Sequence, residues 1–303
     1  MTDVLIAGVA VADIIMGVAE LPRTAEKYRA ENAHVTVGGC AANAAIAVAR
    51  HGGRAHLAAR LGDDLIGSLI VDSLEAEGVG LSLSDRRRGA LSSFSSIYID
   101  RAGERQIMNF RGQGLSETID LAKAPRARAV LADNRWPMLT REAIETARRW
   151  SVPAVIDAEA PFDADAVRGA THIAFSMQGL SEYAPGLSAS DALEQARADF
   201  DCWVAVTDGP EGVWYTAPDG VGHIPSFRVA VVDTLGAGDI WHGAFALQLA
   251  EGAEEVAAIR FANAAAALKC TEFGGASGCP DRRRTEEFLE REAAMSRSRT
   301  APS

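Results

Sequence analysis

Lysine is scarce in this chain of 303 residues: 30 residues are Lys or Arg, and only Lys27, Lys123 and Lys269 are lysine. None of the three follows a glycine, so the GxxxxGK(S/T) sequence of a P-loop is missing and a Walker-type phosphate site is excluded. Acidic residues number 41, and the net charge of −11 disfavours nucleic acid and anionic membrane surfaces as partners. An anionic ligand would therefore need a local site.

The chain also has few cysteines, no CxxC pair and no histidine at zinc-site spacing from them. This arrangement predicts neither a structural metal site nor a disulfide framework, and it favours a reducing compartment. The apolar N-terminus lacks a basic segment and is interrupted by Asp3, Asp13 and Glu20, so we predict a buried strand and a cytoplasmic protein. The segment AGVAVAD lacks the GxGxxG of a nicotinamide dehydrogenase. The cysteines are Cys40, Cys202, Cys270 and Cys279.

Short apolar runs alternate with helical patterns along most of the chain. Such alternation is typical of βαβ units around a parallel sheet that helices cover on both faces. No repeat or linker divides the sequence, so we predict one α/β domain over residues 1–303, with a central, mostly parallel sheet flanked by helices. We expect strands at 4–11, 55–62, 129–133, 153–159, 172–176 and 202–209, and helices at 41–50, 65–78, 141–150 and 191–200. Three further helices, at 238–251, 254–272 and 284–295, have no strand between them and should pack on one face.

Two stretches do not follow this alternation. Residues 28–37 and 92–110 have strand patterns, the second a hairpin that turns at 101–104. They could form a small sheet that closes over a ligand, with insertions at about 12–37 and 92–112, or they could extend the edge of the main sheet. Because exposed strand edges need covering, we predict a homodimer formed through this lid.

A glycine-rich turn precedes the first of the last three helices. The amides of Gly236, Ala237 and Gly238 can point at a ligand there, and the positive end of the helix dipole adds to an anion site. Asp239 falls in the first helical turn, beside the anion. A plain turn with an acidic residue near a helix N-terminus would have the same local pattern.

The longer segment DTLGAGDIWHGAFA resembles the C-terminal signature of the ribokinase-like (PfkB) carbohydrate kinases. VGGCAANAA at 37–45, with ARHGG and RLGDDLIG after it, resembles their N-terminal signature, so the resemblance covers roughly residues 3–292. It implies a ribokinase-like fold with a small β-sheet lid, and the substrates ATP and a sugar. It also implies that Asp239 is the base for a sugar hydroxyl and that Gly236, Ala237 and Gly238 form the anion hole. An aspartate with its ordinary pKa of about 3.9 would be ionised at neutral pH, as this role requires.

Further matches to the family concern the nucleotide. VTDGPEG at 206–212 resembles the TxGxxG turn along the ATP phosphates, and the run ANAAAAL at 262–268 resembles the helix beside adenine. Without the resemblance, the first would be a hairpin turn and the second a tightly packed helix. The residues implied to bind nucleotide are Thr207, Gly209, Gly212, Asn263, Ala266 and Gly275.

Two features concern metal ions. Asp233, with the carbonyls of Leu235 and of the loop 269–278, resembles the monovalent-cation site of many relatives, but Lys269 in the same region leaves a K⁺ requirement open. Many members also have an NxxE element, whereas the matching stretch FSMQGLSE at 175–182 has neither the Asn nor the Glu in place. Mg²⁺ is expected with ATP, and no side-chain ligand for it can be named.

For the sugar, the resemblance implies contacts from Asp13 at the end of the first strand and from the segment that contains Gly38, Gly39 and Asn43. Asp13 can accept two hydroxyl hydrogen bonds, and glycines allow close backbone approach. Cys40 stands where ribokinases usually have lysine, which disfavours plain ribose.

Several polar residues favour an acceptor with an anionic end. Lys27, Arg135, Asn109 and Arg111 could converge above the cleft and bind a phosphate or sulfonate, although in an arginine-rich chain they could equally be solvated surface groups. Lys27, Asn109, ADNRW, AFSMQGL and ALKCTEFGG together resemble the sulfofructose kinase branch, which phosphorylates a ketose with a terminal sulfonate and also lacks NxxE. We therefore expect 6-deoxy-6-sulfofructose as substrate. A neutral sugar such as fructose or ribose, a sugar phosphate, a nucleoside, or a non-catalytic sensor of sugar or nucleotide are the alternatives.

Overall fold

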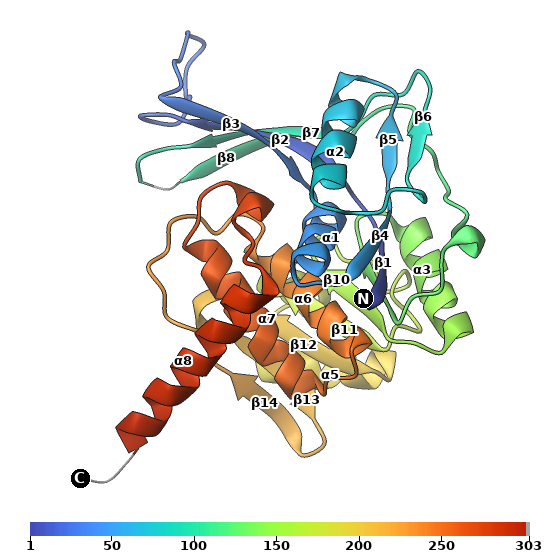
Figure 1. The fold of residues 1–303 in the computed structure, drawn as a ribbon, viewed down its shortest axis with the longest axis vertical. Coiled ribbons are helices and arrows are strands. Elements are labelled where there is room, and N and C mark those ends of the chain that lie inside the picture. Colours follow the sequence, from blue (N-terminus) through green and yellow to red (C-terminus); the bar gives the residue numbers. More distant parts are fainter. Residues whose placement is uncertain (103, 301–303) are drawn as a thin grey trace.

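The main sheet of the protein has eight strands, and the computed structural model describes residues 1–102 and 104–300 (Figure 1). The strand order is β14-β13-β12-β11-β10-β9-β1-β4. The six strands from β12 to β4 are parallel, and β13 and β14 add an antiparallel hairpin at one edge. The strands are β1 (Asp3–Ala7), β4 (Arg54–Ala58), β9 (Ala129–Asp133), β10 (Ala154–Ala158), β11 (His172–Ser176), β12 (Trp203–Thr207), β13 (Val213–Ala217) and β14 (Gly220–Ile224).

Helices cover both faces of this sheet, because its strands are apolar on both sides. In β1, Val4 and Ile6 lie in one buried cluster, while Leu5 and Ala7 lie in another on the opposite face. The helices of the first cluster are α1 (Cys40–Arg50), α2 (Leu65–Ala76), α6 (Ala237–Ala250) and α7 (Glu255–Cys270), and those of the second are α3 (Pro137–Trp150), α4 (Met177–Tyr183) and α5 (Ala189–Phe200). The last helix, α8 (Arg282–Thr300), packs on α7. The predicted α/β class is therefore confirmed, as is the common packing of the last three helices.

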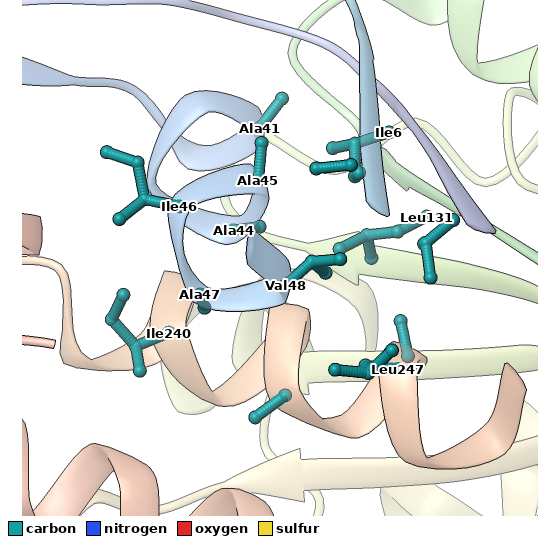
Figure 2. Close-up of a cluster of buried hydrophobic side chains, with 14 of the residues drawn as sticks. Ile6, Ala41, Ala44, Ala45, Ile46, Ala47, Val48, Leu131, Ile240 and Leu247 are labelled. Carbon is teal, nitrogen blue, oxygen red and sulfur yellow. The ribbon is translucent and has the colours of Figure 1, made fainter. Parts of the chain in front are cut away.

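Small side chains bring α1 and α6 into close contact (Figure 2). A Cβ atom on Gly243 would lie 2.3 Å from the carbonyl oxygen of Ala44, so α6 can approach α1 this closely only with glycine at that position. The contact fixes the start of α6 relative to the start of α1. Both helix N-termini contribute to the site described below.

A second, smaller sheet stands apart from the main one. Its strand order is β3-β2-β7-β8, formed by β2 (Val11–Gly17), β3 (Asn32–Gly38), β7 (Phe94–Ile99) and β8 (Arg105–Phe110). Figure 1 shows it projecting from the main body beside the loop that follows the end of α7, and β3 contacts that loop. Of the two expectations for these strands, the separate small sheet is confirmed. Minor elements are β5 (Arg60–Gly62), β6 (Asp85–Arg87), η1 (Leu121–Lys123), η2 (Gly209–Glu211) and η3 (Gly275–Gly278).

The N-terminal apolar run differs from its prediction as a single strand. It divides into β1 of the main sheet and β2 of the small sheet, with the break at Gly8, where a Cβ would lie 2.0 Å from an Asp133 carboxylate oxygen. Asp13 therefore lies within the second strand and not at the end of the first. Strand β14 was not expected, because two glycines in its five residues weaken the strand pattern. No helix within residues 1–102 and 104–300 has both the length and the apolar character to cross a membrane.

Candidate active site

The glycine-rich turn before α6 forms a helix N-terminus with free amides. Gly236 is the N-cap and has φ +76°, in the left-handed region, where glycine is strongly favoured. The Ala237 N–H donates to the carbonyl of Thr234 at 3.2 Å. Within the described part of the chain, the N–H groups of Gly236, Gly238 and Asp239 have no such acceptor. Two of the three predicted anion-hole amides are thus free, and that of Asp239 joins them.

Asn43 links the start of α1 to Asp239. Its Nδ2 donates to Asp239 Oδ2 at 2.7 Å, across 196 residues of sequence. Its Oδ1 is buried and, among the residues described, has no hydrogen-bond partner. A buried acceptor without a donor is costly in a folded protein. This oxygen therefore fits a ligand that brings a hydroxyl to Asp239.

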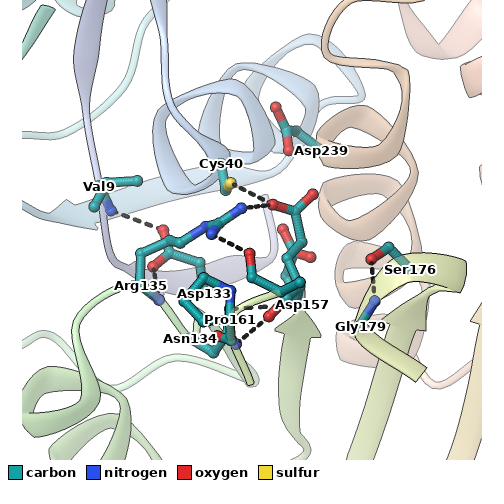
Figure 3. Close-up of polar contacts among 12 residues, drawn as sticks. Val9, Cys40, Asp133, Asn134, Arg135, Asp157, Pro161, Ser176, Gly179 and Asp239 are labelled. Carbon is teal, nitrogen blue, oxygen red and sulfur yellow. Dashed lines mark hydrogen bonds and ion pairs between the residues drawn. The ribbon is translucent and has the colours of Figure 1, made fainter. Parts of the chain in front are cut away.

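Carboxylates from two neighbouring strands gather beside Asp239 (Figure 3). Asp133 is the last residue of β9, Asp157 is the penultimate residue of β10, and Glu159 directly follows β10. Ligand atoms of Cys40, Glu159 and Asp239 all lie within 4.8 Å of one another. Both strands are parallel and end at the same edge, which is where ligands bind in open α/β sheets.

Burial raises the pKa of each aspartate in this cluster. Burial, together with the charges of Asp157 and Glu159, raises the pKa of Asp239 to about 7 against the opposing hydrogen bond from Asn43. Burial also raises the pKa of Asp157 well above its ordinary value and that of Asp133 to about 6. The expectation of an unshifted Asp239 is therefore wrong, because the sequence did not show which carboxylates share its environment.

Asp133, Asp157 and Glu159 were not among the predicted site residues. The signal available was their position at the carboxyl ends of the predicted strands 129–133 and 153–159. Deciding that these two strands neighbour each other, and that both end beside residue 239, required the strand order. Asp133 also has a structural role, since its carboxylate accepts the N–H groups of Val9 and Arg135 at 2.7 and 3.1 Å.

Asp13, predicted to bind sugar hydroxyls, and Asn109, predicted to bind the anionic end, lie in one row across the small sheet. Thr36, Asp13, Ser95 and Asn109 are direct neighbours on β3, β2, β7 and β8, so their side chains share one face. Asn109 Nδ2 donates to Ser95 Oγ at 3.1 Å, and burial raises the pKa of Asp13 against a hydrogen bond from Ser95.

The same face of the small sheet meets the start of α1. A Cβ on Gly38 would lie 2.0 Å from Asp13 Oδ2, and one on Gly39, which has φ +93°, would lie 2.6 Å from the carbonyl oxygen of Val9. These glycines thus let the row of polar residues approach the helix that carries Asn43. Asp13 thus lies against Gly38, five residues before Asn43, which donates to Asp239.

The three basic residues predicted to bind an anion do not lie together. Arg111 and Arg135 line one pocket of about 180 Å³, together with Asn134 and Phe162. The guanidinium of Arg135 is ion-paired with Glu159 and hydrogen-bonded to the carbonyl of Ala160.

Lys27 lies elsewhere. It is exposed in the loop between β2 and β3, which Figure 1 shows projecting from the far side of the small sheet. The expected convergence of Lys27 with Arg135 does not occur within this chain, because the loop that carries the lysine points away from the strand ends.

The residues predicted to bind the nucleotide differ in how far they are exposed and free to contact a ligand. Gly209 is open to solvent on its Cβ side, and Gly212, with φ +101°, turns the chain tightly into β13. Thr207 is half-buried, and its hydroxyl donates to the Phe175 carbonyl at 3.3 Å. The Ala266 side chain on α7 is half-buried.

Asn263 is the exception among them. Its Oδ1 accepts the indole N–H of Trp241 at 2.8 Å, and its Nδ2 donates to the Pro225 carbonyl at 3.3 Å. The side-chain amide is thus used within the protein, and this part of the prediction is not supported. A side-chain amide buried in a helix can hydrogen-bond either within the protein or to a ligand, and the sequence alone does not distinguish these two roles.

The predicted K⁺ site at Asp233 contains a lysine ammonium. Lys269 Nζ donates to Asp233 Oδ2 at 3.0 Å and to the Asp233 carbonyl at 2.8 Å. The N–H groups of Gly274 and Gly275 donate to the same Oδ2, both at 3.1 Å. The carboxylate is therefore fully engaged, and these residues do not fit a metal ion.

Comparison with known proteins gives one consistent result. Residues 1–282 match the family described as "pfkB family carbohydrate kinase". Ribokinase of Bacillus subtilis is 30% identical over 297 residues, covering 95% of this chain and 100% of that protein. The structure of a putative ribokinase from Agrobacterium tumefaciens is 36% identical and superposes with a TM-score of 0.88 over 97% of this chain and 99% of that one. A ribokinase from Arabidopsis thaliana, complexed with ribose and ATP, has the same fold at 23% identity, with a TM-score of 0.85 over 96% of this chain and 99% of that one.

Proposed function

Because the chain belongs to the pfkB family of carbohydrate kinases and is a sugar kinase that uses ATP, we propose that its acceptor is a ketose with an anionic terminus, 6-deoxy-6-sulfofructose in particular. The observation that carries this proposal is the pocket lined by both Arg111 and Arg135 beside the carboxylate cluster of Asp239. Guanidinium groups bind sulfonate and phosphate oxygens with paired hydrogen bonds.

In the proposed reaction, Asp239 is the general base. A primary hydroxyl of the sugar gives its proton to the Asp239 carboxylate, its oxygen forms a bond to the γ-phosphorus, and the bond to the bridging oxygen of ADP breaks. The free amides of Gly236 and Gly238 at the N-terminus of α6 support this, because they can stabilise the transferring phosphoryl group. ATP enters as its Mg²⁺ complex, and the ion travels with the nucleotide as part of the substrate.

Sugar hydroxyls would bind along the row of polar residues on the small sheet. Asp13 is the proposed acceptor for two hydroxyl groups, and the unpartnered Oδ1 of Asn43 takes a third next to the base. The short bond from Asn43 to Asp239 supports this assignment, since it orients the base toward the same ligand. Ser95 and Asn109 complete the row.

A neutral pentose or hexose is the second candidate. The ion pair between Arg135 and Glu159 favours it, because a guanidinium that is already neutralised attracts an anion less strongly. The similarity to ribokinases points the same way. Cys40, beside Asp239 and Glu159, makes this region differ from the usual ribokinase sequence.

A panel of acceptors distinguishes these candidates. ADP release is measured with 6-deoxy-6-sulfofructose, fructose 6-phosphate, fructose, ribose and adenosine as acceptors. The proposal predicts the highest kcat/KM with the sulfonated ketose. A higher kcat/KM with fructose, ribose or adenosine would overturn it.

The small sheet is proposed to act as the lid of a single α/β domain and as the contact of a homodimer. Arg105 of β8 supports the lid, because it donates to the Thr234 hydroxyl at 3.0 Å and so ties the sheet to the loop before α6. Val35 and Met108 support the dimer, because they lie on the face opposite Asp13 and are 49% and 72% exposed. The use of ATP agrees with the cytoplasmic location predicted from the sequence.

A further inference from the structure

Lys269 is a fully buried lysine on α7, with 0% of its surface exposed. Lysine is almost never buried without a partner, since transfer of the ammonium out of water is costly. Among the residues that the structure describes, its partner is Asp233, which accepts from Nζ through both its carboxylate and its main-chain carbonyl. The ammonium therefore has one defined position.

Asp233 connects this ammonium to the anion-hole turn. It lies three residues before Gly236, and its Oδ1 accepts the N–H of Leu235 at 2.8 Å. Its Oδ2 accepts N–H groups from the loop that follows α7, at Gly274 and Gly275. One carboxylate thus holds the two loops that flank the start of α6.

A positive charge is needed at this carboxylate. Asp233 is half-buried, and burial alone would raise its pKa, yet the N–H groups of Leu235 and Gly275 and the Lys269 ammonium together lower it. Without the ammonium, a buried negative charge would lie next to the amides that are to receive the phosphoryl group. A monovalent metal ion at Asp233 would have to share its oxygens with Nζ, which places two positive charges beside one carboxylate.

We propose that the Lys269 ammonium is a tethered monovalent cation that positions the anion-hole turn, so that the kinase needs no K⁺. Lys269 is a positioning residue, since it acts through Asp233 and the turn and does not contact the reacting atoms. The proposal rests on the kinase activity but not on the identity of the sugar.

The first test uses the wild-type protein. Kinase rates and ADP affinity by calorimetry are measured in K⁺, Na⁺ and tetramethylammonium chloride at one ionic strength. We expect all three salts to give the same rates and affinities within about twofold. Activation by K⁺ of about fivefold or more, in rate or in ADP affinity, would overturn the proposal.

The second test replaces the ammonium by a neutral side chain of similar length. Lys269→Met is expected to lose at least about tenfold in kcat without K⁺ and to recover part of it with K⁺ or methylammonium, which can enter the vacated position. Lys123→Met is the matched control, because the side chain of that lysine is 81% exposed and pairs with Asp120 at the surface. Full activity of Lys269→Met without added cation, or a loss that no cation restores in a folded variant, would contradict the proposal.

If Lys269→Met does not fold, the wild-type comparison still decides the question. ADP calorimetry needs no sugar acceptor. Cation-independent ADP binding with no turnover on the acceptor panel would therefore count against the proposed substrate and not against the role of Lys269.

Discussion

Asp239 is subject to two opposing requirements. As a base it must be ionised, whereas burial and the neighbouring Asp157 and Glu159 favour its protonated form and raise its pKa to about 7. A base with a pKa near the working pH accepts a proton more effectively than an ordinary aspartate. Burial and the neighbouring carboxylates thus bring the pKa of Asp239 close to the working pH. As a result, both the rate and the stability of the protein should depend on pH in this range.

The pH dependence of the rate follows from this pKa. We expect kcat/KM to fall as the pH drops below about 7, because protonated Asp239 cannot accept the hydroxyl proton. Glu159→Gln removes a charge that raises this pKa, so the fall should move to lower pH, whereas Glu145→Gln on the surface should leave it in place. A profile that is flat from pH 5 to 8 in the wild type would exclude a raised pKa for the base.

The free energy of unfolding should change with pH in the opposite direction to the rate, and fall as the pH rises. The folded-state pKa of Asp239 is raised above its ordinary value of 3.8, so its protonated form stabilises the fold at low pH and this contribution is lost as the pH rises through about 7. Asp239→Asn should therefore raise the free energy of unfolding by roughly 2–4 kcal/mol at about pH 8 and by little near pH 4. Turnover should fall by about a hundredfold or more. Urea unfolding at the two pH values tests this, and a variant less stable than wild type at both would contradict it.

At the level of single residues, the sequence predicted those whose role depends on a local pattern. Asp239 and the amides around it belong to one turn, and Asn43 belongs to the other signature. The places of Asp157 and Glu159 beside the base follow from which strands are neighbours, and the sequence does not show the strand order. For the same reason the sequence did not predict that Arg135 is ion-paired with Glu159. The role of Lys269 was left open for the same reason, since only the fold shows its ammonium on Asp233.

Among the elements, helices α1 and α6 position the site together. Gly243→Ala should destabilise the protein by about 1–3 kcal/mol, because its Cβ would lie 2.3 Å from the Ala44 carbonyl oxygen in a contact with no room. Gly238→Ala in the same helix is the matched control, since its Cβ meets nothing within 4 Å and helix propensity favours alanine. Thermal unfolding of both variants gives the comparison. Equal melting temperatures would show that close α1–α6 contact does not limit stability.

The six parallel strands of the main sheet were predicted, because strands buried on both faces form continuous apolar runs between helices, whereas the edge strands β13 and β14 were not. The division of the first run into β1 and β2 was not predicted. Both halves are apolar, and the cause of the break is a tertiary contact between Gly8 and Asp133. The hairpin of β7 and β8 was predicted from its turn, while its place in a separate sheet depended on pairing with β2.

For the whole molecule, the exposed apolar face of the lid predicts a dimer. Val35→Glu should convert the dimer to a monomer, because it places a charge in an apolar contact, whereas Val256→Glu should not. Val256 is a suitable control, since it is 39% exposed on α7, outside the lid. Light scattering coupled to size-exclusion chromatography measures both. A monomeric wild-type protein would contradict the proposed contact.

Because the whole chain is acidic, binding of an anionic substrate would depend on the local arginines Arg111 and Arg135. With a net charge of −11 and several carboxylates around the base, an anionic acceptor has no general attraction to this protein and must be held by a specific pocket. The pocket of Arg111 and Arg135 is the proposed place.

The most direct test is the ratio of kcat/KM for 6-deoxy-6-sulfofructose to that for fructose, in wild type and in Arg135→Gln. If loss of the guanidinium changes the pKa of Asp239, kcat/KM changes by the same factor for both sugars, and the change cancels in the ratio. We predict a ratio well above one in the wild type and a fall of at least about tenfold in Arg135→Gln, with Arg148→Gln, exposed on α3, unchanged. A ratio near or below one in the wild type, or one that Arg135→Gln leaves unchanged, would contradict an anionic acceptor.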